Sequence, residues 1–210
     1  MSQDDTQTSG AERAPGRGQS APANRLLLGP RTESHRAYAS VLPDHGAELI
    51  AVTPDRCTDE WLGAWRSSAG ISLPQATTII DVAEQTRSAA RPASGGELGA
   101  GGIQIRTVPG LSDLQHLGET VLDVMGEAQA ADGRRPVLGL HDLSTVVQAA
   151  GLSATFRLLH LVTWEARDHG FTTQVYLDPS AVDATVIETL TPLFDEVRRF
   201  RAGEWTAADH

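Results

Sequence analysis

The sequence predicts an α/β fold of three layers, in which helices cover both faces of a mostly parallel β-sheet. Two observations lead to this prediction. Short runs of consecutive apolar residues, which are typical of strands buried on both faces, recur along the chain. Segments with helical spacing of apolar residues or with helix-capping residues alternate with these runs. The length of 210 residues and the apolar content of 40% fit one domain with a substantial core.

The apolar runs are expected to be the strands of this sheet. The first contains three consecutive leucines, and most of the others are rich in Val, Ile and Leu. The last run alternates only imperfectly between apolar and charged residues, and we interpret it as a late strand. The expected strands are residues 26–28, 47–53, 76–82, 103–108, 136–140, 172–177 and 194–200.

The segments between the strands are expected to be helices. Trp61 and Trp65 share one helical face, where packing in the core is a more frequent role than stacking on a ligand. Ser112, Ser153 and Ser180 are expected to cap the later helices. The expected helices are residues 34–42, residues 58–68, a third from the Ser112 cap to the stop at Asp132–Gly133, a fourth from Ser153 to the stop at His169–Gly170, and a fifth from Ser180 through Leu190.

The domain boundaries follow from changes in composition. Residues 1–24 contain almost no large apolar side chains, so a disordered tail is predicted. A single domain is expected from residue 25 to residue 203, and residues 204–210 are expected to be a second tail. Within the domain, residues 87–102 are rich in Gly, Ala and Ser without periodicity, which predicts a flexible loop.

The composition is acidic and contains no lysine. There are 27 acidic residues against 17 basic residues, all of them arginine, for a formal charge of −10. Such a surface repels nucleic-acid phosphates, so nucleic-acid binding is not expected. Two sources explain this composition and are compatible with each other. A salt-rich, halophilic cytoplasm favours carboxylates, and a GC-rich genome replaces lysine by arginine.

Signatures of disulfides, membrane insertion and metal binding are missing from the sequence. Cys57 is the single cysteine, which excludes an internal disulfide and fits a reducing cytoplasm. No stretch approaches the ~20 apolar residues of a transmembrane helix, and no signal peptide opens the chain, so no membrane contact is expected. The seven histidines show no metal-binding spacing, and no metal site is expected.

The turn after the first strand lacks the parts of a phosphate-binding loop. The strand is followed by Gly29 and Pro30, as such a loop would begin. The pattern Gly-x-x-x-x-Gly-Lys-Ser/Thr would then require Gly, Lys and a hydroxyl residue where this chain has Ser34, His35 and Arg36. Pro30 also lacks the backbone N–H that a phosphate-binding loop would use. The sequence therefore predicts that no functional Walker A motif is present.

Several segments are expected to meet at one edge of the sheet. In a parallel sheet, ligands bind beyond the carboxyl ends of the strands. Four segments directly follow expected strands and should line this edge, which we call the rim. They are Gly29–Arg36, Thr53–Arg56, His141–Ser144 and Asp178.

Short motifs along the chain resemble a haloarchaeal family of unassigned role. Members of that family are similar to RecA/KaiC-type ATPase domains and are sometimes labelled transducer-like. The resemblance covers roughly residues 24–200 and implies a RecA-like P-loop NTPase core, a haloarchaeal source and a cytoplasmic location, but no reaction. The motifs, in chain order, are Leu26–Pro30, Thr58–Leu62, Thr86–Ala89, His141–Gln148, Phe156–His160 and Leu177–Pro179.

Two further positions carry chemistry in the ATPase relatives that the chain resembles. The Walker B position, which orients magnesium, falls at His141, with Asp142 one residue later. Asp142 either holds a metal together with Ser144 or caps the following turn. The acidic pair that activates water corresponds to Asp55 and Arg56, of which only Asp55 can act as a base. A type I turn that begins with the preceding proline explains Asp55 equally well.

These observations favour a non-catalytic RecA/KaiC-like domain, kept for regulation or contact with an unknown protein partner, in signal transduction for example. Near the first strand, Arg31 and Arg36 are the only cations that could face a phosphate. The alternative is a nucleotide sensor or weak ATPase, in which Arg36 replaces lysine while Asp142 and Ser144 place a metal. ATP and magnesium are expected only in that alternative. Oligomerisation through the sheet edges is possible, but no sequence feature marks an interface.

Overall fold

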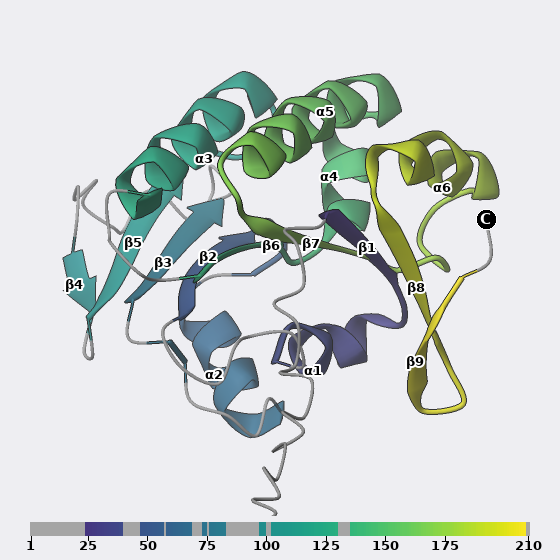
Figure 1. Cartoon of the computed structure of the whole chain (residues 1–210), viewed down its shortest axis with the longest axis horizontal. Helices are drawn as coiled ribbons and strands as arrows, with labels where there is room; N and C mark the ends of the chain where they lie inside the picture. Colours follow the sequence, from purple (N-terminus) through teal and green to yellow (C-terminus); the bar gives the residue numbers. More distant parts are fainter. Residues whose placement is uncertain are drawn as a thin grey trace, which may run out of the picture.

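A computed structural model describes residues 24–39, 47–56, 58–68, 73–74, 76–82, 97–99, 102–129 and 135–208. Residues 1–23 of the predicted tail, most of the predicted loop 87–102, and Cys57 lie outside the described residues. Asn24 begins the first strand and Glu97–Gly99 is a short edge strand, so the predictions of a tail and a loop are wrong at these positions. A nine-stranded sheet forms the centre, in the order β4-β5-β3-β2-β6-β7-β1-β8-β9. Helices cover both of its faces (Figure 1). The predicted three-layer α/β fold with a mostly parallel sheet is therefore confirmed.

The strands from β5 to β8 in this order are all parallel to their neighbours. One short antiparallel strand is added at each edge. The central strands are buried on both faces, which explains their continuous apolar sequences. Leu26, Leu27 and Leu28, for example, are at most 2% exposed. The strands are β1 (Asn24–Leu28), β2 (Ala47–Thr53), β3 (Ala76–Val82), β4 (Glu97–Gly99), β5 (Ile103–Val108), β6 (Arg135–Leu140), β7 (Thr172–Leu177), β8 (Glu196–Arg201) and β9 (Glu204–Ala207).

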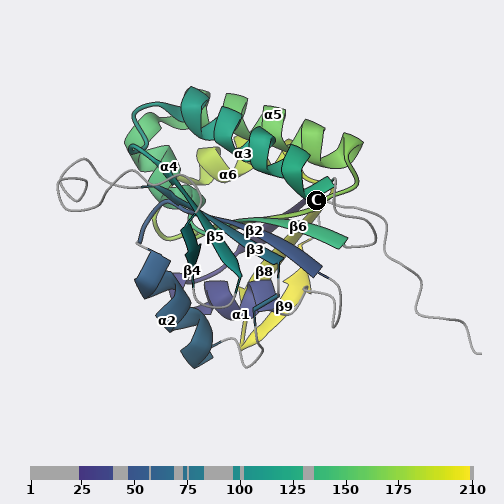
Figure 2. The same cartoon turned by 90° about the vertical axis from the view of Figure 1, so that its left-hand side faces the viewer.

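The helices form two layers, with α3, α4, α5 and α6 on one face of the sheet and α1 and α2 on the other (Figure 2). The apolar core on the second face contains Trp61 and Trp65, which are 0% and 1% exposed, as their spacing predicts. None of the described helices has the length and apolar character that crossing a bilayer requires. The helices are α1 (Ser34–Ala39), α2 (Thr58–Ser68), α3 (Leu114–Gln129), α4 (Leu143–Ala150), α5 (Leu152–Asp168) and α6 (Ala184–Leu190), with 3-10 turns at Arg31–Glu33 and Thr191–Leu193.

The predicted caps of α3 and α5 are wrong by one or two residues. The carboxylate of Asp113, rather than the hydroxyl of Ser112, accepts the hydrogen bond of the His116 N–H, at 3.0 Å. Helix α5 begins after Gly151, so Ser153 lies inside its first turn. Gly151 has a φ of 80°, which a glycine adopts without strain and which separates α4 from α5. Adjacent residues can all serve as caps, and the packing of the helix decides which one does.

Two other helices also depart from the expectation. Helix α6 begins after Asp183, because the N–H and hydroxyl of Ser180 both bind the carboxylate of Asp178, at 2.9 and 2.7 Å. These bonds hold Ser180 in a turn and prevent it from capping the helix. Helix α4 was expected only as a turn, yet it has eight residues.

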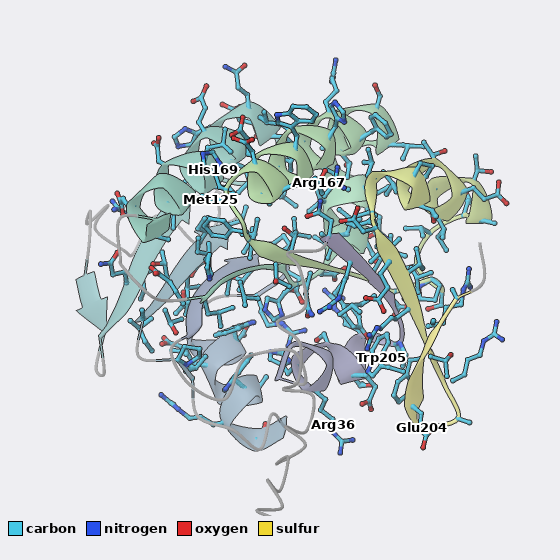
Figure 3. The ribbon with its side chains drawn as sticks, in the orientation of Figure 1. Arg36, Met125, Arg167, His169, Glu204 and Trp205 are labelled. Carbon is cyan, nitrogen blue, oxygen red and sulfur yellow. The ribbon has the colours of Figure 1, made fainter. Side chains whose placement is uncertain are left out.

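The predicted C-terminal tail 204–210 is wrong for its first four residues, which form β9. Strand β9 pairs antiparallel with β8 and extends the sheet by one strand. Trp205 of β9 packs edge-on against Tyr176, with ring centroids 6.0 Å apart, and lies 5.3 Å from the ring of Phe200. Figure 3 shows Trp205 on the same side of the sheet as α1. The hairpin therefore covers the end of β1, where the rim begins.

Gly29 fits beneath this hairpin only because it has no side chain. A Cβ atom at Gly29 would lie 2.8 Å from Trp205 Cη2 and 2.8 Å from the Tyr176 hydroxyl. Both distances are shorter than van der Waals contact. The glycine after β1, which a phosphate-binding loop would use for its turn, therefore serves here to admit aromatic side chains.

We expect Gly29→Ala to destabilise the protein by about 1–3 kcal/mol, because its methyl group overlaps the packed rings. Gly63→Ala is a matched control, since no atom lies within 4 Å of a Cβ at that position of α2. There the same substitution should stabilise the protein by about 0.5–1 kcal/mol, because alanine favours a helix. Urea unfolding of the two variants measures both effects, and equal effects at both positions would contradict the packing described.

Candidate functional site

The rim lies at the carboxyl ends of β1, β2, β6 and β7. These four strands are consecutive neighbours in the sheet, in the order β2-β6-β7-β1. The segments that follow them therefore meet, although they are up to 147 residues apart in sequence. Gly29–Arg36, Thr53–Arg56, His141–Ser144 and Asp178 contact one another at this edge, as expected from their positions after strands.

Arg31 lies at the centre of the rim and binds three aspartates. Its Nη2 atom lies 2.9 Å from Asp55 Oδ2 and 2.7 Å from Asp142 Oδ2. Its backbone N–H donates to Asp178 Oδ2 at 3.3 Å. The side chains of Asp55 and Asp142 are only 3% and 5% exposed, so they have little access to water and depend on this arginine.

The backbone between β1 and α1 follows a short path. The N–H of Gly29 continues the sheet by donating to Leu177 O at 3.2 Å. Pro30 is extended, with φ −66° and ψ 141°, and its carbonyl accepts from the Tyr176 hydroxyl at 2.6 Å and from Glu33 N–H at 2.9 Å. One turn of 3-10 helix, Arg31–Glu33, then leads into α1. The segment where a phosphate-binding loop would curl around a ligand is thus a proline and a helical turn.

The three residues that occupy the second half of the loop pattern have separate roles. Ser34 is buried, and its hydroxyl donates to the carbonyl of Arg31 at 3.1 Å. His35 is buried beneath α1, with Nδ1 3.4 Å from the Ser34 hydroxyl. The Arg36 side chain is 68% exposed and lies 3.7 Å from Glu33. Figure 3 shows Arg36 pointing outward, away from the sheet. The structure therefore directs the Arg31 side chain toward the aspartates of the rim and the Arg36 side chain away from them.

Asp142 and Ser144 tie the ends of β6 and β7 together. Asp142 is the N-cap of α4 and accepts from Thr145 N–H at 3.3 Å and from the Thr145 hydroxyl at 3.0 Å. The capping role that the sequence offered as one alternative is therefore confirmed. The Ser144 hydroxyl accepts from the N–H of Asp178 at 2.9 Å. The Asp142 and Ser144 side chains are thus both hydrogen-bonded to other residues of the chain.

Asp55 is the most enclosed carboxylate of the rim. Its Oδ2 atom is shared by Arg31 and by Arg56, whose Nε and Nη2 both lie 2.9 Å away. Its Oδ1 atom is buried and has no hydrogen-bond partner among the described residues. The two arginines neutralise the charge of Asp55. In the described part of the chain, no three His, Cys, Asp or Glu residues are arranged to hold a metal ion.

The charges at the rim reinforce one another. Burial alone lowers the pKa of Arg31, but the carboxylates of Asp142, Asp55 and Asp178 outweigh burial and raise it. Burial tends to raise the pKa of Asp178, while hydrogen bonds from Ser180 and from the Arg31 N–H, with the Arg31 charge, lower it overall. Arg31 and Asp178 therefore stay ionised at neutral pH, and the rim holds a fixed network of charges.

A cluster of His and Trp rings lies directly beneath the rim, and the sequence did not indicate it. The rings of His35 and His141 have centroids 5.6 Å apart, and Trp61 lies 5.9 Å from His35 and 5.0 Å from His141. Trp65 lies 6.4 Å from His35. We call these four residues the His–Trp layer. The layer fills the space between the end of β6 and helices α1 and α2.

Burial keeps both histidines of this layer neutral. Loss of water lowers the pKa of His35 to about 4, with a further lowering by the charge of Arg56 and an opposing effect of Asp55. The pKa of His141 lies well below its ordinary value, first because of burial and then because of His35 and Arg56. His141 follows β6 at the position that the sequence predicts as the equivalent of Walker B. Here the same position holds an uncharged ring within the core.

Solved structures of low sequence identity share this fold. A protein from Pyrococcus horikoshii OT3, PH0250, matches with a TM-score of 0.57 and 9% identity over 89% of this chain and 86% of its own. An uncharacterized Pyrococcus horikoshii protein, PH0321, was solved in complex with an unknown peptide. It matches with a TM-score of 0.56 and 14% identity, over 85% of this chain and 77% of its own. A DnaB-like replicative helicase matches with a TM-score of 0.50 and 12% identity, over 85% of this chain and 47% of its own. The chain thus has an α/β fold of the RecA-like type.

The family to which the chain belongs is defined by sequence. The model of a family of unknown function, DUF7504, matches residues 22–199, which include the whole rim and the His–Trp layer. The chain is a member of this family. No curated protein matches it.

The low pKa of His35 predicts that stability falls in mild acid. The unfolded chain takes up a proton near pH 6.5, whereas folded His35 does so only near pH 4, so acid favours unfolding below about pH 6.5. Between about pH 7 and pH 5, the wild type should lose about 1–2 kcal/mol more stability than His35→Phe. Urea unfolding at a series of pH values measures this difference. His116→Phe, at an exposed site on α3, is the matched control and should behave like the wild type.

Proposed function

We propose that this chain is a non-catalytic RecA/KaiC-like domain that acts in regulation or in contact with a protein partner, in signal transduction for example. One observation carries the proposal: Arg31, the cation nearest to the end of β1 on the rim, is engaged by the carboxylates of Asp55 and Asp142. A bound triphosphate would have to compete with those carboxylates for the same guanidinium. It would also have to approach three fixed negative charges.

The backbone supports the same proposal. Phosphate sites use successive N–H groups that point at the anion. Here Pro30 has no N–H, and the N–H of Arg31 donates to Asp178. The chain's own carboxylate thus takes the place that a phosphate oxygen would take. Hydrolysis additionally requires a magnesium ion and a positioned water, while Asp142 is engaged by Arg31 and by the first turn of α4.

The alternative, a nucleotide sensor or weak ATPase, requires Arg36 to clamp the phosphates. That arginine is 68% exposed and points away from the rim. Binding would therefore need α1 to move, with Arg31 released from Asp55 and Asp142. Two cavities lined by described residues lie away from the rim. One is a space of about 10 Å³ within the apolar core, and one, of about 230 Å³, lies at the amino ends of β2, β3 and β5.

Titration calorimetry with ATP and magnesium distinguishes the two functions. We expect no binding at millimolar ATP, which corresponds to a Kd weaker than about 1 mM. Tight binding that disappears in Arg36→Ala, but persists in the exposed control Arg66→Ala on α2, would establish the sensor and refute the non-catalytic proposal. A crystal grown with an adenine nucleotide would locate the phosphates in that case.

We also propose that the protein is adapted to a salt-rich, haloarchaeal cytoplasm. The formal charge of −10 without any lysine supports this proposal. Repulsion among the carboxylates destabilises the compact state at low ionic strength, and salt screens this repulsion. The midpoint of thermal unfolding should therefore rise by several degrees between low and molar KCl, as measured by circular dichroism. A midpoint that falls with KCl, or does not change, would contradict salt adaptation.

A further inference from the structure

The outer surface formed by α3 and α5 carries the large apolar side chains that the described residues expose. Trp164 is 62% exposed and Leu161 is 41% exposed, and both lie on α5. They are three residues apart, so they project from the same side of the helix. The other described tryptophans, Trp61, Trp65 and Trp205, are buried or half-buried. An exposed tryptophan beside an exposed leucine marks a surface suited to contact with another protein.

Helices α3 and α5 together form one continuous face. They lie side by side over the sheet in both views (Figures 1 and 2). At Gly118 of α3, an added Cβ would lie 3.3 Å from Leu158 and 3.9 Å from Leu161, so the helices approach closely there. Both helices return the chain from the carboxyl edge of the sheet to its amino edge, so they run in the same direction.

The two helices expose opposite charges on this face. Helix α3 presents Glu119 and Asp123, which are exposed one turn apart. Helix α5 presents Arg157 two turns before Trp164. Neither Asp123 nor Arg157 has an ion-pair partner within the described residues. The face therefore carries two exposed carboxylates on α3, and one arginine beside exposed apolar side chains on α5.

From this pattern we propose that the α3/α5 face binds a second copy of the same chain. A two-fold axis parallel to the helices, over the groove between them, places α5 of each copy against α3 of the other. Trp164 and Leu161 then pack near Leu122 of the partner. Gly118 is level with Leu158 and Leu161, so Arg157 comes closest to Glu119 of the partner, with Asp123 one turn further along. An isologous contact of this kind makes the pairing twice, because each copy supplies both the arginine and the carboxylates.

The area of the α3/α5 face limits how tightly the two copies can bind each other. Helices of 16 and 17 residues are about 25 Å long, and two of them side by side are roughly 20 Å wide. The buried area is then on the order of 1,000 Å² for the pair of copies, near the lower limit for a specific interface. The dimer should therefore be reversible and depend on protein concentration. It leaves the rim free, so it is independent of whether the rim binds a nucleotide.

Sedimentation velocity of the full chain in moderate salt, over a range of concentrations, tests the proposal. The wild type should shift from monomer to dimer as concentration rises. Trp164→Glu should remain monomeric, while Arg66→Glu on the opposite face of the sheet should dimerise like the wild type. Both side chains are exposed, so neither substitution should alter folding, which circular dichroism verifies.

Charge reversal identifies the proposed pairing of α5 with α3. Arg157→Glu should raise the dimer Kd at least about tenfold, and so should Glu119→Arg with Asp123→Arg. Combining all three substitutions should restore a Kd near that of the wild type, because the charges again complement each other. A wild type that stays monomeric at every concentration, a Trp164→Glu variant that still dimerises, or a triple variant without recovery would each overturn the proposal.

Discussion

The ion pairs of Arg31 are the interaction on which the rest of the rim depends. Aspartates follow β2, β6 and β7 at one edge of the sheet, and carboxylates brought so close repel one another unless a cation lies between them. Arg31 supplies that cation from the turn after β1. Asp142, held in this way, also caps α4, and the Arg31 N–H holds Asp178. One residue thus joins the ends of four strands that are distant in sequence.

The same ion pairs lie at the edge of the sheet where ligands bind in parallel α/β folds. The fold brings the turn after β1 and three aspartates to this edge. In this chain, side chains of the protein itself occupy the edge. The guanidinium of Arg31 lies among the carboxylates, and neutral His35 and His141 lie beneath them in the His–Trp layer. The strand ends still meet at one edge, and Arg31 neutralises the carboxylates that gather there.

The two faces of the molecule therefore differ in what they offer to other molecules. At the rim, Arg31 is paired with carboxylates of the same chain, and the Gly29 turn lies under Trp205. On the α3/α5 face, by contrast, Trp164 and Leu161 are exposed on the same helix as the exposed Arg157. The rim is therefore held by contacts within the chain, whereas the α3/α5 face leaves large apolar side chains exposed.

The sequence by itself determined the α/β class, the order of most elements, and the segments that meet at the rim, because apolar periodicity and position after a strand are local properties. The missing lysine was equally visible. Tertiary structure alone decided that Arg31 rather than Arg36 faces the aspartates, that His35 and His141 share a layer with Trp61, and that residues 204–207 form β9. These outcomes depend on strand order and on packing across more than a hundred residues, which no local pattern encodes.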